Sequence, residues 1–116
     1  MTLSVNSRTP VNRRRYKRYI VTGPLAVQGP GGESRGTLLN VGQGGILVRS
    51  DTTFKEGADL SLTFQVAGYP ETFAVQGRVV GTKADVLAFK FLTEPSGLDM
   101  LVRWLDLQHV AWSSVE

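Results

Sequence analysis

The feature that most constrains the fold is a series of short apolar segments separated by turn residues, without helical periodicity between them. In residues 59–66, polar and apolar residues alternate without interruption, which is the pattern of a strand with one buried face. Residues 71–80 read as its partner, because the residues expected on one face are Phe73, Val75, Gly77 and Val79. Similar segments lie around 19–27, 34–39, 46–48 and 86–92. Six short strands at near-regular spacing predict an all-β antiparallel barrel or sandwich.

Turn residues divide this series at three informative places. Gly23-Pro24 interrupts the first apolar segment, so we expect a bent or edge strand there. Residues 28–33 are dense in glycine and proline and should close a hairpin, and residues 81–85 are expected to form a loop. Together these signals set the expected order of the strands along the chain.

The last part of the chain has a different periodicity. After Pro95-Ser96-Gly97, apolar residues recur at helical spacing, at Leu98, Leu101, Val102 and Leu105. The spacing predicts a short amphipathic helix that plugs or flanks one mouth of the barrel. We therefore divide the chain into a flexible lead-in at 1–12, a domain at 13–107 and a tail at 108–116.

Composition restricts the classes of protein to which the chain can belong. A chain of 116 residues, 41% of them hydrophobic, is expected to form one domain with its own core. The absence of cysteine excludes disulfides, thiolate zinc sites and cysteine nucleophiles. No apolar run approaches the roughly 20 residues of a membrane span, and the amino terminus lacks the pattern of a signal peptide. We expect a cytoplasmic protein without a membrane partner.

The charge is concentrated at one end of the chain. Seven of the 13 basic residues but only one of the 10 acids lie before residue 36. Five of these cations fall within 13–18, in the run Arg13-Arg14-Arg15-Tyr16-Lys17-Arg18, which we call the arm. The asymmetry indicates an anionic partner. Since arginine pairs with phosphate oxygens and with the O6/N7 edge of guanine, it also suits a nucleotide. On composition alone, a solvated basic stretch or a nucleic-acid tail explains the arm equally well.

A glycine-rich segment, Asn40-Val41-Gly42-Gln43-Gly44-Gly45, provides a second signal. Glycines can simply supply the positive φ angles of a turn. Three glycines in four residues nevertheless exceed the need of a tight hairpin, and they leave backbone N–H groups open to close approach by a flat or anionic ligand. Alone, this motif is weak.

Together the two segments resemble the motifs of the PilZ family of cyclic di-GMP receptors. The arm matches its RxxxR motif at Arg14 and Arg18, and the second segment matches [D/N]xSxxG at Asn40 and Gly45. The resemblance covers roughly residues 13–107 and implies a six-stranded antiparallel split β-barrel with a short C-terminal helix. It further implies a bacterial second-messenger receptor that is not an enzyme, needs no cofactor or metal, and signals to a separate protein that the sequence does not identify.

The resemblance also implies roles for individual residues. Arg14 and Arg18 would bind the phosphates and guanine edges of cyclic di-GMP, Asn40 would bond a guanine, and Gly45 would let the loop turn beneath the base. An arginine at position 13 goes, in the family, with an intercalated dimer of the ligand. The chain departs from the pattern at Gly42, where the family most often has serine. The lost hydrogen bond is worth about 0.5–1.5 kcal/mol, so we expect weakened but surviving binding.

Three other functional classes are weaker explanations of the sequence. A degenerate PilZ-like adaptor that binds protein and no nucleotide is favoured by Gly42 and disfavoured by the intact arm. A nucleic-acid-binding barrel usually exposes aromatic side chains for stacking, whereas most aromatics here fall at inward positions. An enzyme lacks support, because the sequence shows no paired carboxylates or metal-ligand cluster. The remaining candidates have ordinary structural explanations as surface, tail or packing residues: Arg78, Trp104, His109 and Trp112.

Overall fold

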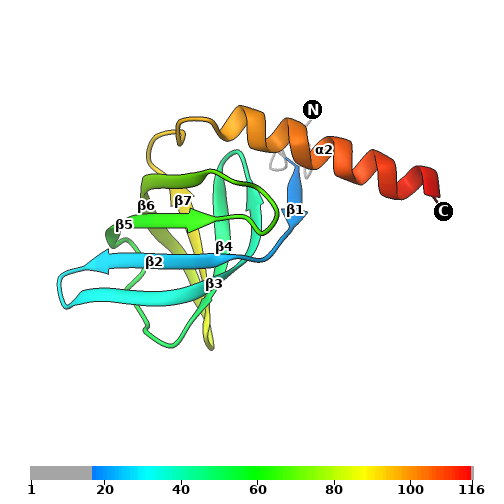
Figure 1. Cartoon of the computed structure of the whole chain (residues 1–116). Helices are drawn as coiled ribbons and strands as arrows, with labels where there is room; N and C mark the ends of the chain where they lie inside the picture. The colour runs from blue at the N-terminus through cyan, green and yellow to red at the C-terminus, as the bar shows by residue number, and fades with distance from the viewer. Residues whose placement is uncertain (1–16, 116) are drawn as a thin grey trace, which may run out of the picture.

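The computed structural model describes residues 17–115, and the side chains of residues 17–108. This part of the chain forms seven strands followed by one helix (Figure 1). In chain order the elements are β1 (Arg18–Ile20), β2 (Pro24–Gly29), β3 (Gly32–Gly42), β4 (Gly45–Ser50), β5 (Asp59–Gln65), β6 (Thr72–Lys83), β7 (Val86–Phe91) and α2 (Leu98–Val115).

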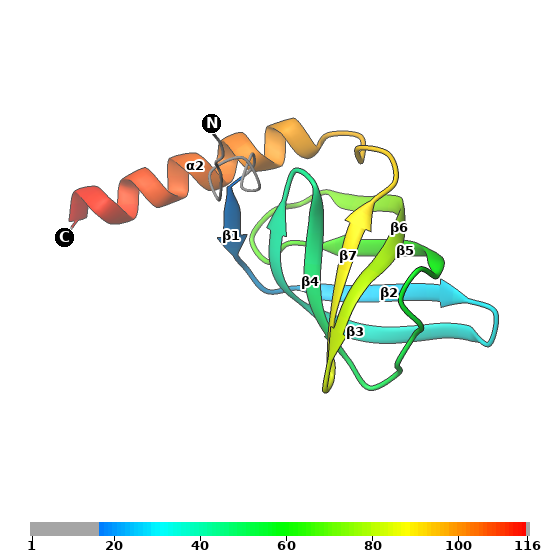
Figure 2. The ribbon, with the colours of Figure 1, turned by 180° about the vertical axis from the view of Figure 1, so that it is seen from behind.

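Six of the strands close into an antiparallel barrel, which confirms the fold class expected from the sequence. Around the ring the order is β3-β2-β5-β6-β7-β4, and β4 closes the ring by pairing with β3. The remaining strand, β1, lies outside the ring and, among the described strands, pairs with β3 alone. Figure 2 shows β1 at one end of the barrel, next to α2. The ring therefore leaves one short strand beside the helix, and this strand begins at Arg18, the last residue of the arm.

The first expected strand is divided in two, as its Gly23-Pro24 break predicted. Both β1 and β2 pair with the same edge of β3, at Asn40–Gly42 and Gly32–Thr37 respectively. Gly23 lies at the bend between them, where an added Cβ would be 1.8 Å from the carbonyl oxygen of Gln65. Only glycine allows the chain to pass so close to β5. The close approach explains why the bend falls at this residue.

The barrel interior is filled from the faces that alternation predicted. Phe73, Val75 and Val79 of β6 are buried, as are Leu87, Phe89 and Phe91 of β7. Phe64 stacks on Phe73 with ring centroids 5.3 Å apart, and on Phe91 at 6.2 Å. The aromatic side chains that alternation placed inward are therefore core residues.

The strand β6 is longer than expected, so the predicted loop at 81–85 is wrong over its first three residues. The register between β6 and β7 shifts between Val79 and Gly81, which marks a β-bulge that absorbs one extra residue. Beyond the bulge, pairing with β7 continues to Lys83. The connection shrinks to two residues, of which Ala84 has a φ of 54°, a conformation that tight hairpins require.

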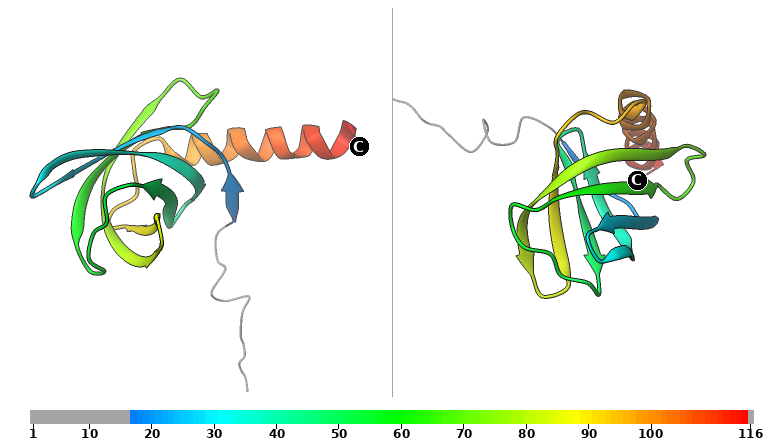
Figure 3. Two further views of the ribbon diagram at one scale, coloured as in Figure 1. Left: turned by 90° about the horizontal axis from the view of Figure 1, so that it is seen from below. Right: turned by 90° about the vertical axis from the view of Figure 1, so that its left-hand side faces the viewer.

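The C-terminal helix forms where apolar spacing predicted it but is longer than the sequence suggested. Leu98, Leu101 and Leu105 are buried against the barrel, and α2 begins where Gly97, with a φ of 84°, ends the preceding turn. The helix continues to Val115, so the segment expected as a tail is helical over 108–115. Figure 3 shows α2 running past the end of the barrel. Among the described residues, no helix is both long and apolar enough to cross a membrane.

Candidate functional site

The pairing of β1 with β3 brings the end of the arm against the glycine-rich segment. In this register Arg18 lies opposite Gly42, and Ile20 lies opposite Asn40. Side chains at alternate positions share a face, so Arg18 and Asn40 are diagonal neighbours on one face of the pair. The Arg18 Nη1 atom donates a hydrogen bond to Asn40 Oδ1 at 3.0 Å. Two sequence motifs 22 residues apart are thus joined by a direct contact.

A β-bulge in β3 turns Asn40 toward Arg18. The register between β3 and β4 shifts between Leu38 and Asn40, so Leu39 is an extra residue on the β3 side. The backbone of this bulge bonds to the bend before β2: Val21 N–H donates to Leu39 O at 3.2 Å, and Leu38 N–H donates to Gly23 O at 2.8 Å. Bulges re-aim the side chains that follow them. Here both Leu38 and Val41 are buried, which leaves Asn40 half-buried at the arm.

Gly42, the departure from the family pattern, is buried beneath the arm. A Cβ added there would be 2.8 Å from the carbonyl oxygen of Lys17, closer than real Cβ atoms approach. A serine would require the arm backbone to move away from β3. The glycine therefore lacks the hydroxyl of the motif's serine, and it permits the backbone at Lys17 to approach β3 more closely.

Gly45 also faces a backbone carbonyl, but one that belongs to the barrel. It is the first residue of β4 and pairs with Lys90 of β7. An added Cβ would be 2.1 Å from the carbonyl oxygen of Phe89. Neither Gly42 nor Gly45 is among the glycines with positive φ. Both are used for close approach rather than for turning.

Contacts between the site and α2 were not anticipated from the sequence. The Tyr19 hydroxyl donates a short hydrogen bond to Asp106 Oδ1, and Lys17 Nζ lies 3.4 Å from the same oxygen. Gln43 Nε2, in the connection between β3 and β4, donates to Asp99 Oδ1 at 3.3 Å. No local periodicity relates positions so far apart. The one signal in the sequence is the seven-residue spacing of Asp99 and Asp106, which places both acids on one side of a helix.

Burial and the Asp106 carboxylate together change the acidity of Tyr19. Its ring is half-buried and packs against the core. Burial first, then the hydrogen bond to Asp106 and the charge of that carboxylate, raise the pKa of Tyr19 to about 12. The hydroxyl is therefore protonated at neutral pH and acts as the donor.

The other residues singled out in the sequence take different places. Arg13 and Arg14 lie outside the described residues, as do the side chains of His109 and Trp112. Arg78 lies on β6, opposite β3 in the ring, and pairs with Asp59 at 2.7 Å and 3.1 Å. The Asp59 carboxylate raises the pKa of Arg78. Trp104 packs against Tyr69, with ring centroids 5.2 Å apart.

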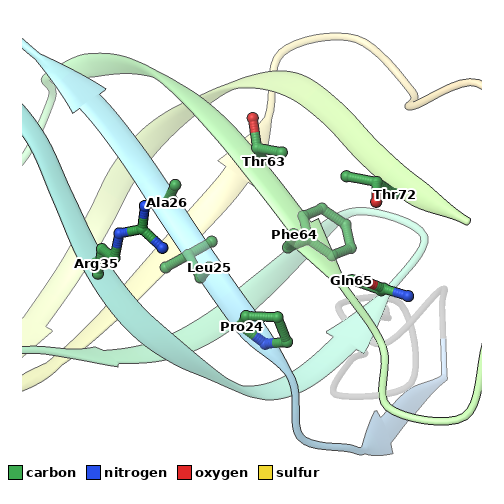
Figure 4. Close-up of a pocket in the computed structure, with 8 residues that line it drawn as sticks. All are labelled: Pro24, Leu25, Ala26, Arg35, Thr63, Phe64, Gln65 and Thr72. Atoms are coloured by element: carbon green, nitrogen blue, oxygen red, sulfur yellow. The ribbon is translucent and has the colours of Figure 1, made fainter.

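A pocket of about 140 Å³ lies on the barrel between β2 and β5, and its lining is drawn in Figure 4. Its one charged lining residue, Arg35, is paired with Glu33 at 3.2 Å. It includes none of the residues of the two motifs. Within the part of the chain that the structure describes, no group of three or more histidine or acidic side chains could hold a metal ion. The contact between the arm and β3 remains the candidate site.

Comparisons with known proteins agree with this architecture. The sequence profile of the PilZ domain matches residues 12–107. No curated protein matches the sequence significantly. Among solved structures, the Bacillus subtilis inhibitor of motility MotI/DgrA is similar with a TM-score of 0.74 and 18% identity, over 85% of this chain and 52% of that chain. The chain thus spans about half the length of the Bacillus protein.

Two isolated PilZ domains are similar over almost their whole lengths. The PilZ domain of YcgR from Escherichia coli, solved with c-di-GMP, gives a TM-score of 0.66 and 19% identity, over 89% of this chain and 97% of that chain. The PilZ domain of CeSA from a cellulose-synthesizing bacterium gives 0.58 and 14%, over 80% and 98%. At these identities the likeness establishes the fold.

Proposed function

Because the chain belongs to the PilZ domain family, we propose that it is a receptor for cyclic di-GMP that binds the ligand between the arm and β3. The observation that carries the proposal is the hydrogen bond from Arg18 to Asn40 at 3.0 Å. It joins the two motifs of the family on one strand face, with Arg18 exposed to solvent. A guanidinium held in this way offers its remaining N–H groups to a phosphate or to a guanine edge.

The similar YcgR domain supports the choice of ligand, since its structure contains c-di-GMP. We assign Arg14 and Arg18 to the phosphates and guanine edges, Asn40 to a guanine, and Gly42 and Gly45 to the close passage of backbone at the site. Arg13 would stack on an outer guanine and favour an intercalated ligand dimer. In this proposal the ligand neutralises the like charges of the arm, and the resulting order in the arm is read by a partner protein in a bacterial cytoplasm.

Gly42 favours a second candidate function, that of an adaptor without nucleotide binding. The residue supplies no hydroxyl, and the Lys17 carbonyl occupies the space that a serine Cβ would need. Against this, Arg18 and Asn40 lie side by side on one face, joined by a hydrogen bond of 3.0 Å, so that one ligand can reach both side chains. We therefore prefer the receptor.

Isothermal titration with cyclic di-GMP tests the proposal directly. Wild type should release heat, and Arg18→Ala should weaken binding by about 10- to 100-fold, because hydrogen bonds from a charged group are worth about 1.5–3 kcal/mol. Asn40→Ala should also weaken binding. Arg49→Ala is the matched control. Arg49 is an exposed arginine of β4 that pairs with Asp85 at 3.3 Å, and the variant should bind cyclic di-GMP as wild type does.

Several outcomes would contradict the receptor. No heat with wild type at tens of micromolar protein would favour the adaptor. If single-stranded oligonucleotide displaced cyclic di-GMP and bound more tightly at physiological salt, the arm would be a nucleic-acid-binding segment. Two ligands per chain would support the role assigned to Arg13, and one ligand per chain would remove it.

A further inference from the structure

The strand β1 has two faces with different neighbours. Arg18 and Ile20 lie on the face that Asn40 shares, and the Ile20 side chain is 95% exposed. Lys17 and Tyr19 alternate to the other face, where both reach Asp106 of α2. The residue that we assign to the ligand is therefore held by a strand whose opposite face is attached to the helix.

The Tyr19 contact is the stronger of the two attachments. The Lys17 side chain is 72% exposed, and exposed ion pairs contribute little because water and salt screen them. Tyr19 is half-buried, packs against the core, and donates its hydroxyl to a charged acceptor. Hydrogen bonds to ionised groups are roughly twice as strong as neutral ones. Of these two contacts, the one with Tyr19 is therefore the stronger link between Asp106 and β1.

Within the described residues, the backbone of β1 is attached to the barrel along one edge. The strand has three residues, lies outside the closed ring and pairs along one edge with β3. Short segments with few buried contacts open locally at low cost. The position of Arg18 then depends on what anchors the back of the strand.

We propose that Asp106 is a positioning residue for ligand binding. Its carboxylate holds the Tyr19 hydroxyl and thereby fixes β1, so that Arg18 is presented beside Asn40. The inference rests on the proposed function for its ligand. The same proposal gives α2 a role in transmitting ligand binding. Asp99 of this helix accepts a hydrogen bond from Gln43, in the glycine-rich segment, at 3.3 Å. Both motif segments are thereby linked to one helix. By reciprocity, a ligand that orders these segments also strengthens the docking of α2.

The first experiment measures cyclic di-GMP affinity in Asp106→Ala, Tyr19→Phe and the double variant. Each single change should weaken binding about 5- to 10-fold, within the range of coupling energies of residues in direct contact. The double variant should be no weaker than the worse single variant, because the two side chains act as one unit. Asp106→Asn should bind more tightly than Asp106→Ala, since the amide oxygen still accepts the Tyr19 hydrogen bond.

Two controls separate positioning from loss of fold. Asp59→Ala removes an exposed aspartate paired with Arg78 on β5 and β6, and it should leave affinity unchanged. Stability is measured for every variant as the midpoint of urea denaturation. Asp106→Ala should lose more affinity for cyclic di-GMP than a control variant with the same midpoint. Wild-type affinity in Asp106→Ala, or additive losses in the double variant, would overturn the proposal.

The second experiment needs no ligand and distinguishes this inference from the receptor proposal. Hydrogen exchange of the Val21 amide, which bonds to Leu39 O at 3.2 Å next to β1, should be several-fold faster in Asp106→Ala, while barrel amides such as Val79 keep their rates. Unchanged exchange at Val21 would refute the anchor. If wild type failed to bind cyclic di-GMP while Asp106→Ala still exchanged faster at Val21, the receptor proposal would be refuted. The proposal that Asp106 anchors β1 would stand.

Discussion

Gly42 and Gly45 lie in one sequence motif, but a side chain at each position would meet a different kind of backbone. The nearest carbonyl groups belong to segments that are held to different degrees by the barrel. The Lys17 carbonyl at Gly42 belongs to the arm, next to a three-residue strand outside the ring. The Phe89 carbonyl at Gly45 belongs to β7, which is paired on both sides, with β4 and with β6. The backbone at Lys17 can shift away from a new side chain without opening the ring, whereas a central barrel strand cannot shift without breaking its hydrogen bonds to its neighbours.

Alanine at the two glycines should therefore have unequal effects. Gly45→Ala should lower the free energy of unfolding by more than about 3 kcal/mol or prevent folding, and Gly42→Ala by about 1–2 kcal/mol, in the range of overpacked sites. Urea denaturation followed by circular dichroism measures both. Gly31→Ala is the control, because nothing lies within 4 Å of an added Cβ there. Equal losses at 42 and 45 would contradict the reasoning.

The contact between the elements β1 and α2 gives Tyr19 a pKa above the ordinary value of a tyrosine. Tyr19 has its pKa raised from 10.0 to about 12 by burial and by Asp106. The folded state thus holds the phenol proton more tightly than the unfolded state. Its contribution to stability is complete below pH 10, declines as the pH rises above that value, and is lost as the pH passes about 12.

Ultraviolet absorbance of tyrosinate during an alkaline titration measures this effect. The chain contains three tyrosines, and one of them should ionise only near pH 12 in the folded protein. Tyr19→Phe should remove that late component, and Asp106→Ala should shift it toward lower pH without abolishing it, because burial is the larger cause. A late component that persists in Tyr19→Phe would assign the shift to another residue.

The sequence predicted the elements best where residues pack locally. Alternation in 59–66 and in 71–80 identified β5 and most of β6, because period two places every second side chain in the core. The extension of β6 to Lys83 was missed, since a bulge at Val79–Gly81 breaks that period. The helix was underestimated, because its apolar spacing ends near Leu105 whereas the helix continues to Val115.

The candidate site was predictable in part. The motifs led us to expect site roles for Arg18, Asn40, Gly42 and Gly45, and the structure brings these residues to adjoining positions on β1, β3 and β4. That Arg18 lies opposite Gly42 depends on the bend at Gly23, which the Gly23-Pro24 pair indicated, and on the bulge at Leu39, which is set by pairing with β4 and has no signal in the sequence. The bond from Tyr19 to Asp106 spans 87 positions and could not be read from local patterns.

At the scale of the whole molecule, the helix and the barrel share one core. Leu98 and Leu101 of α2 have no exposed surface, and they belong to the same buried cluster as Phe73 and Phe89. Met100, between them in the chain, is 60% exposed. The helix is therefore expected to unfold with the barrel in a single cooperative transition.

Substitutions on the two faces of α2 test this shared core. Leu101→Ala should lower the free energy of unfolding by about 2–5 kcal/mol, as for other buried leucines. Met100→Ala, the matched control one residue earlier, should change it by less than about 0.5 kcal/mol. Urea denaturation followed by circular dichroism and by tryptophan fluorescence should give coincident curves. A separate, earlier fluorescence transition would show that α2 unfolds apart from the barrel.

The distance along the chain from Gly23 sets which face of β1 each residue occupies. Because side chains of β1 alternate between the α2 side and the Asn40 side, each residue's surroundings depend on whether it lies an even or an odd number of positions from the bend. One residue inserted between Ile20 and Gly23 would send Arg18 toward Asp106 and Tyr19 toward solvent, whereas two would restore the order. The spacing from Arg18 to Gly23 is thus as much a determinant of the site as the arginine itself.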